Sequence, residues 1–192
     1  MGQSKEWKWG YISPQGDFVI APTFDGASDF SEGLAAVNID WARGYIDHEG
    51  YFIIKPTFEA AEDFKDGRAI VKVHGESRCI DREGNFKDDA VGVREPVHEI
   101  ESGYNPKYEL HDGLVRFVEN QKFGYKDKDG NVVIEPKFFE ATDFSEGLAA
   151  VKKGKTGLWG YIDTAGRIVI SARFRQAKSF HEGLAAVLTA VE

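Results

Sequence analysis

Short apolar runs separated by turn residues form the main pattern of this chain, and they predict β-strands rather than helices. In the first copy of the pattern, Trp9-Gly-Tyr-Ile12 and Asp17-Phe-Val-Ile20 predict two strands joined by a hairpin turn that closes at Gly16. We expect the second strand to end at Pro22, because proline has no backbone N–H to donate to a strand ladder.

A linker and a third strand complete this pattern. The linker, residues 24–30, has apolar residues at positions 24, 27 and 30, and this spacing predicts one helical or 3₁₀ turn against the core. Gly33 then precedes Leu34-Ala-Ala-Val37, which predicts the third strand. Each pattern therefore predicts three short antiparallel strands, which are too few to form a core without neighbours.

The pattern recurs five times along nearly the whole chain. Two signatures recur in register: a glycine-closed turn after the first strand, and an acid-glycine pair before the third strand. The predicted units of this single repeat domain, residues 1–192, are 7–40, 41–74, 75–120, 121–156 and 157–192. The third unit is irregular, because 29 positions separate Gly84 from Gly113 where 17 separate Gly16 from Gly33. We therefore place an insertion near residues 85–98.

The residues of the unit starts resemble a known repeat. Lys8-Trp9-Gly10 and Trp159-Gly160-Tyr-Ile-Asp, together with Leu-Ala-Ala-Val later in the unit, are similar to the WG repeat, a bacterial β-rich repeat also called KWG. The second unit has Arg43 in place of the tryptophan, and we expect Trp41 to lie on the same strand face. The resemblance implies a repeat scaffold and brings no catalytic residues with it.

The predicted terminal strands suggest how the units are arranged. The chain starts on a first strand and ends on a third strand, and in an open array both would be exposed apolar edges. Pairing the last third strand with the first removes both edges. We therefore favour an all-β, closed, five-bladed propeller-like ring, which would be a monomer. The alternative is an open, curved β-array or solenoid that dimerises end to end.

Composition and charge exclude several classes of function. The net charge is −8 and the pI about 5.2, which argues against a nucleic acid partner. No run of about 18 apolar residues predicts membrane insertion, and the first six residues do not resemble a signal peptide, so we expect a cytoplasmic protein. One cysteine cannot form an internal disulfide, and Cys79 replaces a tyrosine of the other units as a core residue. The five histidines lack the spacing of a zinc site, so we expect no metal and no cofactor.

Repeated turn residues are the first candidates for function. Asp47, Asp81, Asp127 and Asp163 follow the first strand, and we interpret them as hairpin side chains rather than metal ligands. The acids before the second glycine predict an acidic band that stabilises turns or binds a basic partner protein: Glu32, Asp66, Asp112, Glu146 and Glu182. One form of this hypothesis is a non-enzymatic scaffold of the immunity type that neutralises a cationic partner.

The insertion and the aromatic residues supply further candidates. Arg94, His98 and Tyr108 are residue types common at interfaces, and repeat proteins carry insertions on one face, which is often the binding face. Trp7 and Trp41 predict the alternative function, a carbohydrate or cell-wall ligand bound on aromatic side chains. A third hypothesis is a hydrolase with its site in the insertion, although no catalytic arrangement stands out from the repeats.

Overall fold

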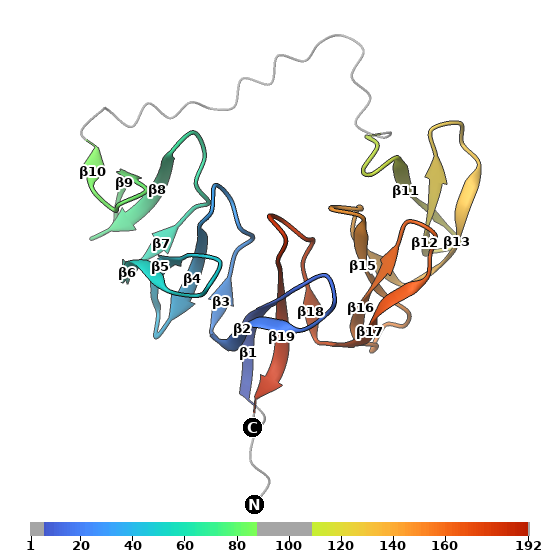
Figure 1. Cartoon of the computed structure of the whole chain (residues 1–192), viewed down its shortest axis with the longest axis horizontal. Coiled ribbons are helices and arrows are strands. Elements are labelled where there is room, and N and C mark those ends of the chain that lie inside the picture. Colours follow the sequence, from blue (N-terminus) through green and yellow to red (C-terminus); the bar gives the residue numbers. More distant parts are fainter. Residues whose placement is uncertain (1–5, 88–108, 192) are drawn as a thin grey trace, which may run out of the picture.

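The computed structural model describes residues 6–87 and 109–191, and within these ranges it consists of β-strands, turns and loops (Figure 1). The part of the chain that is described holds no helix long and apolar enough to cross a membrane.

Each unit contains a first, a second and a third strand, as the sequence predicted. The first strands are β1 (Glu6–Ile12), β5 (Ala42–Ile46), β9 (Glu76–Asp81), β12 (Lys122–Asp127) and β16 (Trp159–Asp163). The second strands are β2 (Phe18–Phe24), β6 (Phe52–Phe58), β10 (Phe86–Lys87), β13 (Val132–Phe138) and β17 (Ile168–Phe174). The third strands are β4 (Ala35–Ile39), β8 (Arg68–Val73), β11 (Leu114–Glu119), β15 (Leu148–Lys152) and β19 (Ala185–Val191). Two-residue strands lie between the second and third: β3 (Gly26–Ala27), β7 (Ala60–Ala61), β14 (Glu140–Ala141) and β18 (Gln176–Ala177).

These strands form five small antiparallel sheets; four of them combine two consecutive units, and the fifth combines the last unit with the first. The third strand of one unit pairs with the first strand of the next, as in β4 with β5. The strand orders are β3-β4-β5-β6, β10-β9-β8-β7, β11-β12-β13, β14-β15-β16-β17 and β18-β19-β1-β2. The all-β prediction and the repeated antiparallel units are therefore confirmed.

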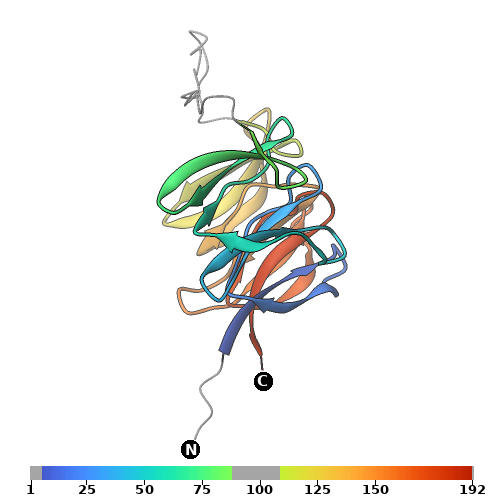
Figure 2. The same cartoon turned by 90° about the vertical axis from the view of Figure 1, so that its left-hand side faces the viewer.

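The two ends of the chain meet in one sheet. Strand β1 pairs with β19 from Glu6 opposite Val191 to Ile12 opposite Ala185. Figure 2 shows β1 and β19 side by side. The predicted pairing of the first and last strands is confirmed, and it buries both apolar edges in a ladder.

The five sheets follow one another along an arc (Figure 1). Four buried clusters join neighbouring sheets, and none of the four joins the sheet that contains β10 to the sheet that contains β11. These two sheets lie at opposite ends of the arc. The described residues therefore form a five-sheet arc.

Two local predictions were wrong. Strand β2 does not stop at Pro22 but runs to Phe24, because it is the outer strand of its sheet, where a missing N–H breaks no ladder. The linker is not helical. Its middle forms β3, which pairs with β4 through Gly26 opposite Asn38, so the three-residue apolar spacing reflects a kinked extended segment.

Tight hairpins precede the third strands and are linked from sheet to sheet. In the first of them, Ser31 and Leu34 exchange both backbone hydrogen bonds, and Glu32 and Gly33 both have positive φ, at 54° and 80°. Two positive φ values are the signature of a type I′ turn.

The acid of each linked hairpin accepts a hydrogen bond from the glycine N–H of the next hairpin. The donor–acceptor pairs are Gly67 N to Glu32 Oε2 (2.9 Å), Gly147 N to Asp112 Oδ2 (2.8 Å), Gly183 N to Glu146 Oε2 (3.0 Å) and Gly33 N to Glu182 Oε2 (2.9 Å). We call this series the hairpin chain. It holds four sheet junctions in the same geometry.

Candidate functional site

The tryptophan and glycine at the start of a unit have separate structural roles. A Cβ on Gly160 would lie 2.5 Å from the carbonyl oxygen of Ile170 and 2.8 Å from the backbone nitrogen of Ala172. The outer strand β17 therefore crosses directly over this position, and only glycine fits beneath it. Trp159, one residue earlier, is partly buried and packs against the neighbouring core cluster. Its ring lies at the junction between the sheet that contains β16 and the sheet that contains β18.

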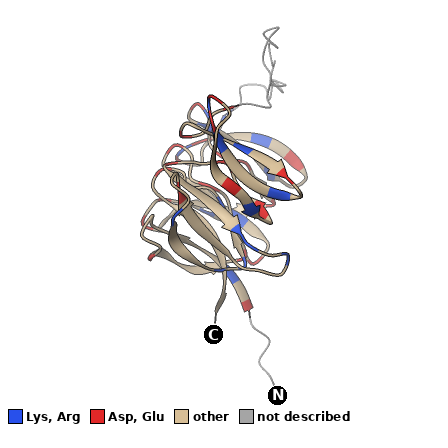
Figure 3. Ribbon diagram, turned by 90° about the vertical axis from the view of Figure 1, so that its right-hand side faces the viewer, with Lys and Arg blue, Asp and Glu red and all other residues tan. Residues whose placement is uncertain are grey.

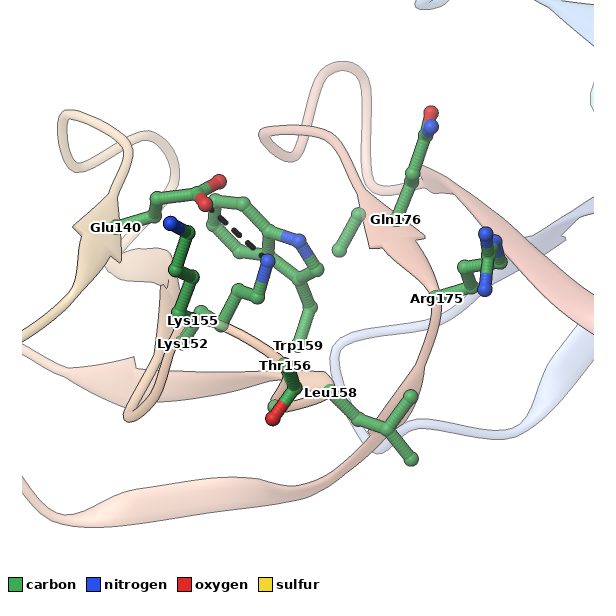
Figure 4. Close-up of a pocket in the computed structure, with 10 residues that line it drawn as sticks. Glu140, Lys152, Lys155, Thr156, Leu158, Trp159, Arg175 and Gln176 are labelled. Atoms are coloured by element: carbon green, nitrogen blue, oxygen red, sulfur yellow. Dashed lines mark hydrogen bonds and ion pairs between the residues drawn. The ribbon is translucent and has the colours of Figure 1, made fainter.

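A groove of about 600 Å³ opens beside Trp159 (Figure 4). It lies between the sheet that contains β16 and the sheet that contains β18. Its lining consists of Glu140, Lys152, Lys155, Thr156, Gly157, Leu158, Trp159, Arg175, Gln176 and Ala177. We call it the Trp159 groove. Its volume lies within the range of small-molecule sites.

A longer loop forms one wall of the Trp159 groove. Lys152 pairs with Trp159 and the chain between them has six residues, 153–158. At the equivalent place in the second sheet, Asn38 pairs with Arg43 and only four residues intervene. The loop before Trp159 is thus two residues longer than its counterpart, and its residues 155–158 line the groove.

Positive charge dominates the side chains of the Trp159 groove. Lys152 Nζ lies 3.1 Å from Glu140 Oε1 and 6.0 Å from the centroid of the Trp159 ring. Lys155 and Arg175 have no carboxylate within 4.0 Å among the residues that the structure describes. Arg175 instead lies over the ring of Trp7, 4.9 Å from its centroid. The groove thus contains two cations that no acid of the described part of the chain neutralises.

A smaller hollow of about 220 Å³ lies beside the equivalent Trp9. Asn38 and Arg43 line it, and Asn38 Oδ1 is buried without a hydrogen-bond partner. Arg43 donates a hydrogen bond to the carbonyl oxygen of Ala61. The position next to the repeat tryptophan is therefore hollow at two sheet junctions, and the hollow beside Trp159 is the larger of the two.

The repeat tyrosines are core residues. Tyr11, Tyr45, Tyr125 and Tyr161 are almost completely buried, and each hydroxyl donates to a backbone carbonyl 17 residues later. Burial raises the pKa of all four hydroxyls above the ordinary tyrosine value. Cys79 takes the tyrosine position in the third unit and is also buried, so its predicted packing role is confirmed.

The turn aspartates act as predicted. Asp127 Oδ1 accepts hydrogen bonds from the backbone N–H of Asp129 (2.9 Å) and Asn131 (2.8 Å), and the other three aspartates make the same pair of bonds. Bonds from the Asn131 side chain and backbone lower the pKa of Asp127. No group of three or more potential metal-ligating side chains occurs within residues 6–87 and 109–191.

The five predicted acidic residues lie in the hairpins that precede the third strands, where most of them accept a hydrogen bond from a neighbouring hairpin. Four of them, Glu32, Asp112, Glu146 and Glu182, form the hairpin chain. Asp66 is the fifth and is exposed at the last hairpin before the end of the arc. Figure 3, in which the ribbon is coloured by residue type, shows basic and acidic residues interspersed along the strands that face the viewer.

The two predicted aromatic residues, Trp41 and Trp7, lie in different environments. Trp41 is not on the strand face with Arg43: it lies in the turn between β4 and β5, with φ of 68° and 93% exposure. The sequence prediction failed because Asp40 and Trp41 form a two-residue turn, which ends the strand alternation. Trp7 lies on β1, is 37% exposed and is near the Trp159 groove through its contact with Arg175. Arg94, His98 and Tyr108 lie outside the described residues, so their predicted roles stay predictions.

Sequence reasoning missed the side chains that form the Trp159 groove with the tryptophan. Glu140, Lys155, Arg175 and Gln176 come from two different sheets, and no spacing along the chain connects them. The loop insertion before Trp159 was the one signal in the sequence that marked this junction.

Comparison with known proteins identifies the repeat. A family model described as WG containing repeat matches residues 9–40, 44–76, 123–156 and 159–189, together more than half of the chain. No curated protein matches the chain. A solved structure titled "Crystal structure of the eukaryotic initiation factor" is similar over 92% of this chain and 55% of that one, with 12% sequence identity and a TM-score of 0.25. The chain thus spans about half the length of that protein, and so low a TM-score carries no argument.

Proposed function

Since the chain belongs to the family of WG-containing repeat proteins, we propose that it is a non-catalytic scaffold that binds a partner protein on the outer strands of its sheets. The observation that carries this proposal is a pair of exposed apolar residues repeated on four of those strands. We call them the edge pairs: Phe18–Val19, Phe52–Ile53, Val132–Val133 and Ile168–Val169.

The second residue of each edge pair is left out of the strand ladder and is about half exposed. In the first sheet, Tyr11 lies opposite Ile20 and Ile12 lies opposite Phe18, so Val19 is bulged out of the ladder. The same register shift occurs in the other three sheets. Val19 and Ile53 are 49% exposed, and Val133 and Val169 are 45% exposed. Exposed apolar surface repeated in this way is typical of a protein interface.

The outer strands favour side-chain docking over strand addition. A bulge in each strand, and a proline in β2, β6 and β13, interrupt the ladder that an added strand needs. The net charge of −8 favours a partner with a basic surface, whose association would weaken as the salt concentration rises. An immunity-type role, in which such a partner is neutralised, is the specific form of this proposal.

Substituting threonine at the four bulged positions is expected to weaken partner binding at least tenfold while the fold is kept. Threonine is also β-branched, so V19T/I53T/V133T/V169T removes apolar surface without removing strand propensity. A protein captured by the wild type from its source cells is purified, and its affinity for both forms is measured by calorimetry. We expect the affinity to fall at least tenfold.

The matched control is A21S/K55Q/E135Q, which changes exposed residues of the same outer strands. This variant is expected to bind as the wild type does. Equal affinity of the partner for the wild type and the threonine variant, with equal melting temperatures, would contradict docking on the edge pairs.

We also propose that the arc closes into a monomeric, five-bladed propeller-like ring. The support is the hairpin chain, which stops at Asp66 on one end sheet and at Gly113 on the other. Val115 and Phe117 on the end sheet are partly exposed, whereas the equivalent Ala35 and Val37 are buried against a neighbouring sheet. A fifth link, from Gly113 N–H to the Asp66 carboxylate, would complete the series.

Amide hydrogen exchange tests ring closure. We expect the Gly113 amide to exchange as slowly as the Gly147 amide, and D66A to accelerate Gly113 exchange at least tenfold. D129A, which removes an exposed acid on a first-strand turn, is expected to leave Gly113 unchanged. Rapid exchange of Gly113 in the wild type, or a dimer in sedimentation, would contradict the monomeric ring.

A further inference from the structure

The Trp159 groove contains two cations that pair with no carboxylate of residues 6–87 and 109–191. Lys152 is paired with Glu140, but Lys155 and Arg175 form no salt bridge among the described residues. This occurs in a chain with a net charge of −8, in which acids outnumber bases by 32 to 24. A local positive site in an acidic protein attracts a negatively charged ligand.

The shape of the groove adds a flat apolar surface to this charge. Trp159 is fixed from behind by the core cluster and by the strand that crosses Gly160, so its ring does not need to be ordered on binding. Figure 4 shows Glu140, Lys152 and Lys155 gathered on one side of the ring, with Gln176 and Arg175 across the groove. The indole thus lies between two polar walls.

We propose that the Trp159 groove binds a saccharide that carries carboxylate groups, such as a short chain of hexuronic acid units. The apolar face of a sugar ring packs on the indole. The Glu140 carboxylate accepts hydrogen bonds from sugar hydroxyls, and the Gln176 amide both accepts and donates them. Lys155 and Arg175 each bind a sugar carboxylate with a charge-assisted hydrogen bond.

The two walls favour an acidic saccharide over an acidic peptide. The Glu140 carboxylate has acceptor capacity that hydroxyls satisfy, and a saccharide supplies hydroxyls beside its carboxylates, whereas an acidic peptide supplies mainly carboxylates. The volume of about 600 Å³ suits a ligand of a few sugar rings. This site is separate from the edge pairs, so the saccharide proposal and the protein-partner proposal fail or stand independently.

Calorimetric titration with trigalacturonate tests the proposal, and the methyl ester of the same trisaccharide serves as the neutral probe. We expect saturable binding of the acid and at least tenfold weaker binding of the ester, because esterification removes the charges that Lys155 and Arg175 bind. K155Q and R175Q are each expected to weaken binding of the acid about tenfold.

The matched control is K153Q, which removes an exposed lysine from the same loop but not from the groove lining. It is expected to change the affinity less than twofold. Equal binding of the acid and the ester would overturn the proposal, as would a loss in K153Q as large as in K155Q. Tighter binding of a glutamate-rich peptide than of trigalacturonate would also overturn it, and would assign the groove to acidic peptides.

Discussion

Replacing Gly44 by alanine is expected to lower the free energy of unfolding by about 3 kcal/mol. The added Cβ would lie 2.5 Å from the carbonyl oxygen of Ile54 and 2.7 Å from the nitrogen of Pro56. Both are backbone atoms of the bulged outer strand β6, so no side-chain rotation relieves the overlap. Either β6 separates from β5, or the buried contacts of Tyr45 and Phe58 are distorted.

Thermal unfolding followed by circular dichroism measures this effect. For a domain of this size, about 3 kcal/mol corresponds to a melting temperature roughly 6–12 °C lower. Gly154→Ala is the matched control, because a Cβ at Gly154 meets no atom within 4 Å and the residue is in the groove loop. We expect G154A to melt with the wild type. A melting temperature for G44A equal to that of G154A would mean that β6 does not cross over Gly44.

Deleting residues 1–12 is expected to abolish cooperative folding. The deletion removes β1, which pairs with β19 along its whole length, and it leaves β2 without the strand to which it is bonded. It also removes the completely buried Tyr11 and Ile12 from two different core clusters. The loss of two such side chains costs about 5–10 kcal/mol, which is comparable to the whole stability of a typical domain.

Circular dichroism and urea unfolding of the truncated chain, with and without a synthetic peptide of residues 1–13, measure this effect. The peptide is expected to restore a cooperative transition, because its backbone supplies the missing ladder to β19. A peptide of the same composition in scrambled order should not do so. Cooperative unfolding of the truncated chain at the wild-type urea midpoint would contradict the central role of the β1–β19 pair.

Local sequence predicted the elements of this fold well, because the same few positions recur in every unit. The glycine-closed turns, the turn aspartates and the buried tyrosines are each satisfied within one or two strands. Prediction failed where the position of a residue depends on whether its strand is an outer strand of the sheet, or on how many residues form a turn. Pro22 is accepted inside β2 because β2 is an outer strand, and Trp41 left the strand face because the turn took two residues.

The candidate sites were harder to predict, because their residues meet only where neighbouring sheets pack together. The five acids were identified as a group from their spacing, but the bonding of four of them to the next hairpin depends on how two sheets pack. The Trp159 groove combines residues of neighbouring sheets, and only its longer loop left a trace in the sequence. The edge pairs look like ordinary core strands in the sequence, because the bulge that exposes Val19 is not encoded in its alternation.

The sequence by itself determined that this protein is an all-β repeat chain of WG-containing units, and it favoured, without deciding, the pairing of the first and last strands. It determined this because strand periodicity and turn chemistry are local and are repeated five times. Only the tertiary structure decided which side chains meet across the sheet junctions. It joined the turn acids into the hairpin chain, placed Lys155 and Arg175 around the same groove as Trp159, and left the edge pairs exposed, because each of these depends on contacts between units rather than on the order of residues within one.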